Sequence, residues 1–243
     1  MSQTYSMQSD VAAYAGPTER ATFMRRTYLH VAGAVFAFVM LEALIFSVLS
    51  QSQTDFIGGL FFRTPGMWLL VLVPFILVGY VADRWAHTSA SPTMQYLGLG
   101  LYVVAEAVIF LPLLIAAYRL SGDMQIIAKA GILTLFAFGG LTVAALLTRK
   151  DFSFLGPILS VGGFLLLGLV LISSFMPHFV SLGLWFAFLA VALAAGSILY
   201  STSNIMHHYS TNMHVAAALS LFAALAMMFW YVLQILMSLS SRD

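Results

Sequence analysis

Seven apolar runs, each close to the ~20 residues that cross a bilayer as a helix, constrain this chain more than any other feature. Turn formers or charges separate them, as at Thr64-Pro65-Gly66 and Arg149-Lys150-Asp151. The weakest division, Met176-Pro177-His178, could instead be a re-entrant break within the membrane. The pattern predicts an all-α integral membrane protein with seven transmembrane helices after a polar segment over residues 1–26. The expected spans cover residues 27–49, 66–82, 95–117, 126–147, 154–175, 181–200 and 214–239.

Composition supports this class and excludes others. Hydrophobic residues make up 61% of the 243 residues and charged residues 8%, too much apolar surface for a soluble fold to hide. Ten basic and nine acidic residues give a net charge of +1, so we expect no nucleic-acid partner. The chain has no cysteine, no His-Glu-x-x-His motif and no phosphate-binding loop, so we expect neither an enzyme nor a bound cofactor or metal.

The distribution of lysine and arginine predicts the orientation. Residues 1–26 lack the short apolar core and cleavage site of a signal peptide, so the first span should be retained. With the N-terminus inside and the C-terminus outside, six basic residues are cytoplasmic and four are external, which agrees with the positive-inside rule. The internal set is Arg20, Arg25, Arg26, Arg84, Arg149 and Lys150, and the external set is Arg63, Arg119, Lys129 and Arg242.

Small residues recur every three to four positions in the last two spans, and such faces allow helix backbones to approach closely. They comprise Gly183, Ala187, Ala190 and Ala194 in one span, and Ala216, Ser220, Ala223 and Ala224 in the other. These faces are common in ordinary membrane packing and say nothing about transport. They favour a seventh helix surrounded by the others.

The C-terminal third carries three characteristic segments: Ile-Leu-Tyr-Ser-Thr-Ser-Asn-Ile at 198–205, Ala-Leu-Ser-Leu-Phe at 218–222 and Leu-Gln-Ile-Leu at 233–236. Together they resemble the signature of the Bax inhibitor-1 family, also called the transmembrane Bax-inhibitor motif or YccA-like group. The resemblance implies a seven-helix fold with the last helix at the centre, in a bacterial inner membrane. For characterised members it also implies a pH-sensitive calcium leak.

Two positions depart from that family pattern. The family's sensing element is a pair of aspartates, and here Ser201 stands at the first position and Ala224 at the second. Close carboxylates raise one another's pKa and so respond to protons, which neither serine nor alanine can do. The family's gating mechanism therefore does not carry over to this chain.

Two acidic residues, Glu42 and Glu106, lie deep inside apolar spans. A carboxylate in hydrocarbon costs several kcal/mol unless it is protonated, paired or hydrated, so an ion or proton pathway is the functional hypothesis. With ~1.5 Å of rise per residue, Glu106 should lie near mid-membrane and Glu42 about 6 Å further out. The alternative is structural: a protonated glutamate bonded to a hydroxyl or carbonyl of a neighbouring helix.

Histidines gather in the expected cytoplasmic loop between the last two spans. Because imidazole as a side chain responds to pH in the neutral range, His207 and His208 could sense cytoplasmic pH in place of the missing aspartates. A solvated loop without that role is the alternative, and adjacent histidines on different helical faces make a poor metal site. Ser201, Thr202, Ser203 and Asn204 are expected to cap the end of the sixth span or to bond its last carbonyls.

Two functions from different classes follow. The first is a pH-sensitive cation leak, for calcium or protons, with Glu42 and Glu106 in the pathway. The second is a non-conducting membrane protein that modulates other membrane proteins, such as a membrane protease. Both place the chain in the lipid bilayer.

Overall fold

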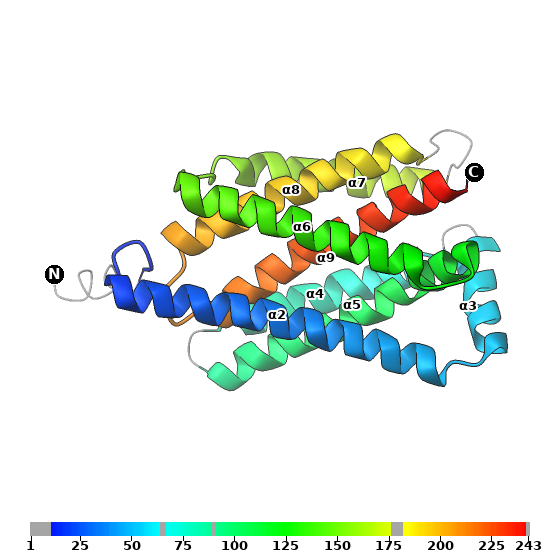
Figure 1. Cartoon of the computed structure of the whole chain (residues 1–243), viewed down its shortest axis with the longest axis horizontal. Helices are drawn as coiled ribbons and strands as arrows, with labels where there is room; N and C mark the ends of the chain where they lie inside the picture. Colours follow the sequence, from blue (N-terminus) through cyan, green and yellow to red (C-terminus); the bar gives the residue numbers. More distant parts are fainter. Residues whose placement is uncertain (1–10, 64–66, 89–90, 176–181, 242–243) are drawn as a thin grey trace.

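The computed structural model describes residues 11–63, 67–88, 91–175 and 182–241. These residues form eight α-helices and one isolated bridge between Val11 and Ser210. The helices are α2 (Pro17–Val48), α3 (Gln51–Arg63), α4 (Leu69–Ala86), α5 (Pro92–Ser121), α6 (Gln125–Thr148), α7 (Leu155–Phe175), α8 (Leu184–His207) and α9 (His214–Ser240). Figure 1 shows the long helices running side by side between two ends, and we name the end at which α2 begins the N-terminal end.

Seven of these helices, α2 and α4 to α9, are long and apolar enough to cross a membrane. The prediction of an all-α membrane protein with seven transmembrane helices is confirmed. Several helices extend past the expected spans: α2 begins ten residues earlier, at Pro17, and α8 continues to His207. The possible re-entrant break at 176–178 lies outside the described residues.

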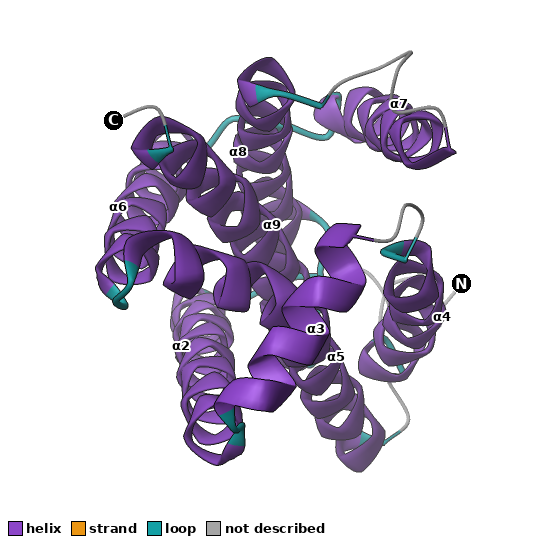
Figure 2. Ribbon diagram, turned by 90° about the vertical axis from the view of Figure 1, so that its right-hand side faces the viewer, coloured by secondary structure: helices purple, strands orange, loops and turns teal. Residues whose placement is uncertain are grey.

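Helix α3 has no counterpart among the expected spans. It crosses the end opposite the N-terminal end at a steep angle to the other helices (Figures 1 and 2). The Arg119 guanidinium donates to the Asp55 carboxylate and so ties α3 to the end of α5. At 13 residues, α3 is too short to span a bilayer, and its position fits a helix lying at the membrane surface.

The ends of α5 show how local sequence sets a helix boundary. Ser91 has an extended backbone, and its side chain accepts a hydrogen bond from the Met94 amide at 3.4 Å. Pro92 occupies the first turn, where its missing N–H costs nothing. At the other end Gly122 adopts a left-handed conformation, with φ at 73°, and its amide bonds to the Tyr118 carbonyl.

The last helix is at the centre of the bundle, as expected. Helix α9 packs against α2, α4, α5, α6 and α8, and Figure 2 shows these helices around it. Of its most apolar window 61% is buried, against 6% for α7. Ala216, Ala217 and Ala218 are fully buried against these neighbours. Of the predicted small-residue face, Ala216 and Ala224 are buried, whereas Ser220 and Ala223 are only partly buried.

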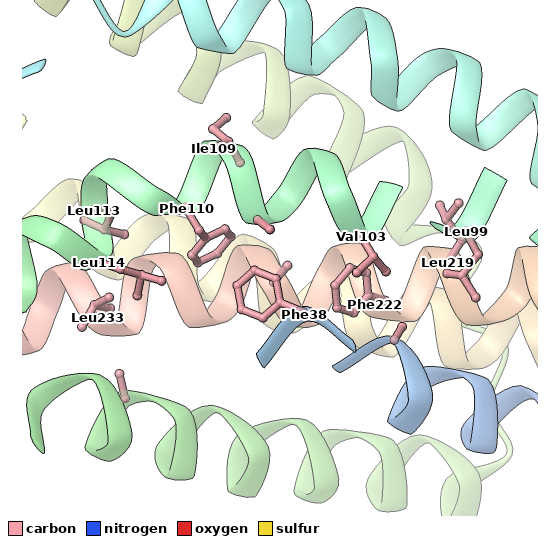
Figure 3. Packing of buried hydrophobic residues seen from close by; sticks show 14 of the residues in the cluster. Phe38, Leu99, Val103, Ile109, Phe110, Leu113, Leu114, Leu219, Phe222 and Leu233 are labelled. Carbon is pink, nitrogen blue, oxygen red and sulfur yellow. The ribbon is translucent and has the colours of Figure 1, made fainter. Parts of the chain in front are cut away.

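Aromatic rings fill the space where α2, α5 and α9 meet (Figure 3). The Phe38 ring meets the Phe110 ring edge to face, with centroids 5.2 Å apart, and lies 6.3 Å from Phe222. Such edge contacts add stability beyond the buried area. This packing fixes α5 against α9 and thereby fixes the direction in which the remaining residues of α5 point.

The contact between α4 and α5 depends on Gly98. A Cβ built there would lie 2.5 Å from the Ala82 carbonyl oxygen and 2.6 Å from the Ala86 amide nitrogen. We expect Gly98→Ala to lower the free energy of unfolding by about 1–3 kcal/mol, the usual cost of overpacking, because backbone cannot yield as a side chain can. Gly100→Ala is the control, since a Cβ there meets nothing within 4 Å. Equal thermal unfolding of the two variants in detergent would contradict this close approach.

Candidate functional site

A cleft of about 1470 Å³ runs along one side of α9. Helices α4 and α5 form one wall, α7 and α8 form the other, and α9 forms the floor. The two walls pack differently on the rest of the bundle. Helix α7 packs mainly on α8, whereas α4 packs on both α5 and α9. Figure 2 shows α4 and α7 on the right-hand side of the view and α9 near its centre. Helices α4 and α7, one in each wall, make no extensive contact with each other in the described part of the chain.

Glu106 lines this cleft midway along α5. The residue is only 5% exposed, and the Tyr102 hydroxyl lies beside its carboxyl from one helical turn earlier. Polar residues also line both ends of the cleft: Asp83 towards the N-terminal end, and Gln234 towards the other. The buried Glu106 carboxyl thus lies between two polar ends of the cleft.

Glu42 is placed differently. It lies on the face of α2 that packs on α5 and α9, one turn after Phe38, and is 6% exposed. It is not among the described residues that line the cleft. Neither of its carboxyl oxygens has a hydrogen-bond partner within the described part of the chain. The structure therefore gives the two glutamates different surroundings.

Ser201 and Ala224, the predicted positions of the family aspartates, both line the same cleft as Glu106. Ser201 comes from α8 and Ala224 from α9, two helices in extensive contact. Both residues are buried. At these two predicted positions the chain has a hydroxyl and a methyl group that line the cleft.

A polar network extends from Asp83 at the N-terminal end of the cleft. The Asp83 carboxylate, which lines the cleft, lies 3.2 Å from Nδ1 of His87, and Nε2 of His87 lies 3.2 Å from the Tyr209 hydroxyl. The hydrogen bond from His87 to Asp83 raises the pKa of His87 above its ordinary value, against the opposing effect of burial. On the other side, the Tyr209 carbonyl accepts from the Ala12 amide at 2.9 Å, so the N-terminal segment holds the same loop.

Sequence reasoning missed this network. Asp83 and His87 are spaced by four residues, so their proximity on one helical face was readable from the sequence. Their contact with Tyr209 was not, because 122 residues separate it from His87.

His207 and His208 lie elsewhere, beside the junction of α8 with the α6–α7 loop. Nδ1 of His207 lies 2.9 Å from the Ser203 carbonyl, and His208 is exposed. The Ser203 hydroxyl accepts from the Phe152 amide at 2.8 Å, which ties the loop to α8. Because α8 continues to His207, the prediction that residues 201–204 cap its end is wrong: they lie within its last two turns.

Comparisons with known proteins agree with the fold. A family profile described as "Inhibitor of apoptosis-promoting Bax1" matches residues 20–241. The chain is 28% identical over 236 residues to Bax inhibitor 1 of Schizosaccharomyces pombe, covering 92% of this chain and 79% of that protein. It is 37% identical over 163 residues to the uncharacterized protein PA2604 of Pseudomonas aeruginosa, covering 66% and 68%. It is 30% identical over 230 residues to the uncharacterized protein Cj0236c of Campylobacter jejuni, covering 93% and 92%. With seven apolar helices around a central last helix, the chain is an integral membrane protein that belongs to the Bax inhibitor family.

Proposed function

We propose that this protein is a pH-sensitive cation leak whose pathway is the cleft and whose pathway carboxyl is Glu106. One observation carries the proposal: an almost fully buried carboxyl lines a cleft with polar residues at both ends. Intramembrane carboxyls are costly and characteristically mark ion or proton pathways. The N-terminal end would face the cytoplasm of a bacterial inner membrane, since Arg84, Arg149 and Lys150 all lie there.

Protons suit this site better than calcium. Calcium takes six to eight oxygen ligands, mostly carboxylates and carbonyls. Beside Glu106 the described cleft residues offer the Tyr102 hydroxyl, while Phe75, Ile109 and Phe110 are apolar. A single carboxyl can still accept and release a proton if water enters from the polar ends.

The Asp83–His87–Tyr209 network is the pH-sensitive element in this proposal. It lies at one mouth of the cleft, whereas Ser201 and Ala224 cannot titrate. Protonation of His87 strengthens its contact with Asp83, and deprotonation frees the carboxylate at the mouth. His207 and His208 remain a second candidate for pH sensing on the same side of the membrane.

The network makes a prediction for stability. The pKa of His87 is raised from its ordinary value of 6.5, so the pair should contribute fully below pH 6.5 and lose its contribution as pH rises through the raised value. We expect His87→Gln to lower the melting temperature in acid but not in alkali. The loss in free energy of unfolding should be less than about 1 kcal/mol, because the pair is partly exposed. His208→Gln, at an exposed position, is the control. A pH-independent difference between wild type and His87→Gln would contradict the network.

The proposal is tested by flux into proteoliposomes. Vesicles that contain the purified protein and a trapped pH dye should lose an imposed proton gradient faster than empty vesicles, and a trapped calcium dye compares the two ions. Faster entry of calcium than of protons would overturn the choice of ion. No flux of either ion would overturn the leak itself.

The second candidate is a non-conducting protein that modulates other membrane proteins. It is favoured by the lateral position of the cleft and by α7, whose apolar window is only 6% buried and so offers a helix face to a partner. Recovery of a membrane protease with the protein, together with vesicles that leak no faster than empty ones, would support this function.

A further inference from the structure

The cleft carries charge of one sign. Of the described residues that line it, two are charged, Asp83 and Glu106, and both are acidic. The described lining includes no lysine, arginine or histidine. An anionic ligand, such as a fatty acid, would meet uncompensated repulsion there, whereas a cation would be attracted.

Aromatic residues flank the buried carboxyl along α5 and line the cleft near it. Tyr102 and Phe110 lie one turn before and after Glu106 on α5. The Phe75 ring lies 6.0 Å from the Tyr102 ring, and the Trp230 ring lies 5.0 Å from the Phe110 ring, centroid to centroid. All four aromatic residues line the cleft. Aromatic faces attract cations whose charge is spread over an organic group, which is how proteins recognise quaternary ammonium ligands.

Size and access fit an organic ligand. The cleft volume of about 1470 Å³ exceeds the ~300–1,000 Å³ of typical small-molecule sites. Residues of α4 and α7 line it, and these two helices make no extensive contact with each other in the described part of the chain, so we expect an apolar molecule dissolved in the bilayer to reach it between them. A bare metal ion would use neither the apolar walls nor this volume.

We propose that the cleft binds lipophilic monovalent organic cations, with Glu106 as the counter-charge and the aromatic rings that line the cleft as the contact surface. A dispersed charge costs less free energy to remove from water than a compact one. The bound cation would then compensate the carboxylate at a site with little water. Binding of organic cations in the cleft is a separate property from the proposed leak, because it does not require that ions cross the membrane.

Two probes of the same shape and opposite charge test the proposal. Tetraphenylphosphonium carries a positive charge inside four phenyl groups, and tetraphenylborate carries a negative one. We expect saturable binding of tetraphenylphosphonium to purified protein in detergent by equilibrium dialysis, and at least roughly tenfold weaker binding of tetraphenylborate, the ratio that about 1.4 kcal/mol produces. Similar binding of both probes would mean partition into any apolar surface and would overturn the proposal.

Variants locate the site. Glu106→Gln should weaken tetraphenylphosphonium binding roughly tenfold or more, while Glu106→Asp and the control Glu42→Gln keep it. If Glu106→Gln does not fold, Trp230→Leu is the second test, because it keeps the Glu106 charge and removes one aromatic face of the cleft. We expect it to weaken tetraphenylphosphonium binding. Unchanged binding in either folded variant would overturn the site. Binding in a protein that shows no flux would leave this proposal standing and the leak refuted.

Discussion

Replacing Glu106 with glutamine is expected to reduce the proton leak of reconstituted protein by about tenfold or more, because an amide cannot accept and release protons in place of the buried carboxyl that lines the cleft. Glutamine has nearly the same shape and keeps a polar group beside Tyr102. The fold should therefore survive, which thermal unfolding in detergent checks. The measurement is the decay of an imposed pH gradient in vesicles with a trapped dye.

Glu42→Gln is the matched control for the leak. It makes the same chemical change in another span, at a residue outside the described cleft lining. We expect its leak rate to equal that of wild type. If Glu42→Gln instead abolishes the leak and Glu106→Gln does not, the pathway follows α2 and the cleft is not the conduit. Wild-type rates in both variants would remove both glutamates from the mechanism.

The long helices could be predicted because a bilayer sets their length. Each apolar run had to supply close to 20 residues, and the bounds of α6, as the structure has them, differ from the expected 126–147 by one residue at each end. Helix α3 could not be found this way, since its 13 residues include Asp55 and three glutamines or serines in the first turn. The Arg119–Asp55 ion pair helps to hold it in place, and no local sequence pattern predicts that pair.

The candidate site was only partly predictable. Glu42 and Glu106 stand out because charge is rare in these spans, but which one meets a cleft depends on how each helix is rotated against its neighbours. On α2, Phe38 and Glu42 share one face, and the packing of Phe38 on Phe110 turns that face inward. On α5, the same contact leaves Glu106 facing the cleft. Such rotations arise from tertiary packing and are not local properties of either sequence.

Glu42 is expected to lower the stability of the protein. Both carboxyl oxygens are buried without a hydrogen-bond partner among the described residues, and an unsatisfied buried polar group costs about 1–3 kcal/mol. Replacing it with leucine removes that cost and adds apolar contact in a face already formed by Ala34 and Phe38. We therefore expect Glu42→Leu to raise the free energy of unfolding by about 1–3 kcal/mol, measured as an increase in melting temperature in detergent.

The comparison with Glu42→Gln separates polarity from shape. Glutamine keeps two polar atoms in the same place, so it should give little of the gain that leucine gives. If leucine raises stability and leaves the leak unchanged, the Glu42 carboxyl only lowers the free energy of unfolding. The pathway is then confined to the side of α9 that carries Ala224. A loss of stability or of leak in Glu42→Leu would instead mean that the carboxyl is bonded or hydrated in the membrane, and α2 would then share the pathway with α5.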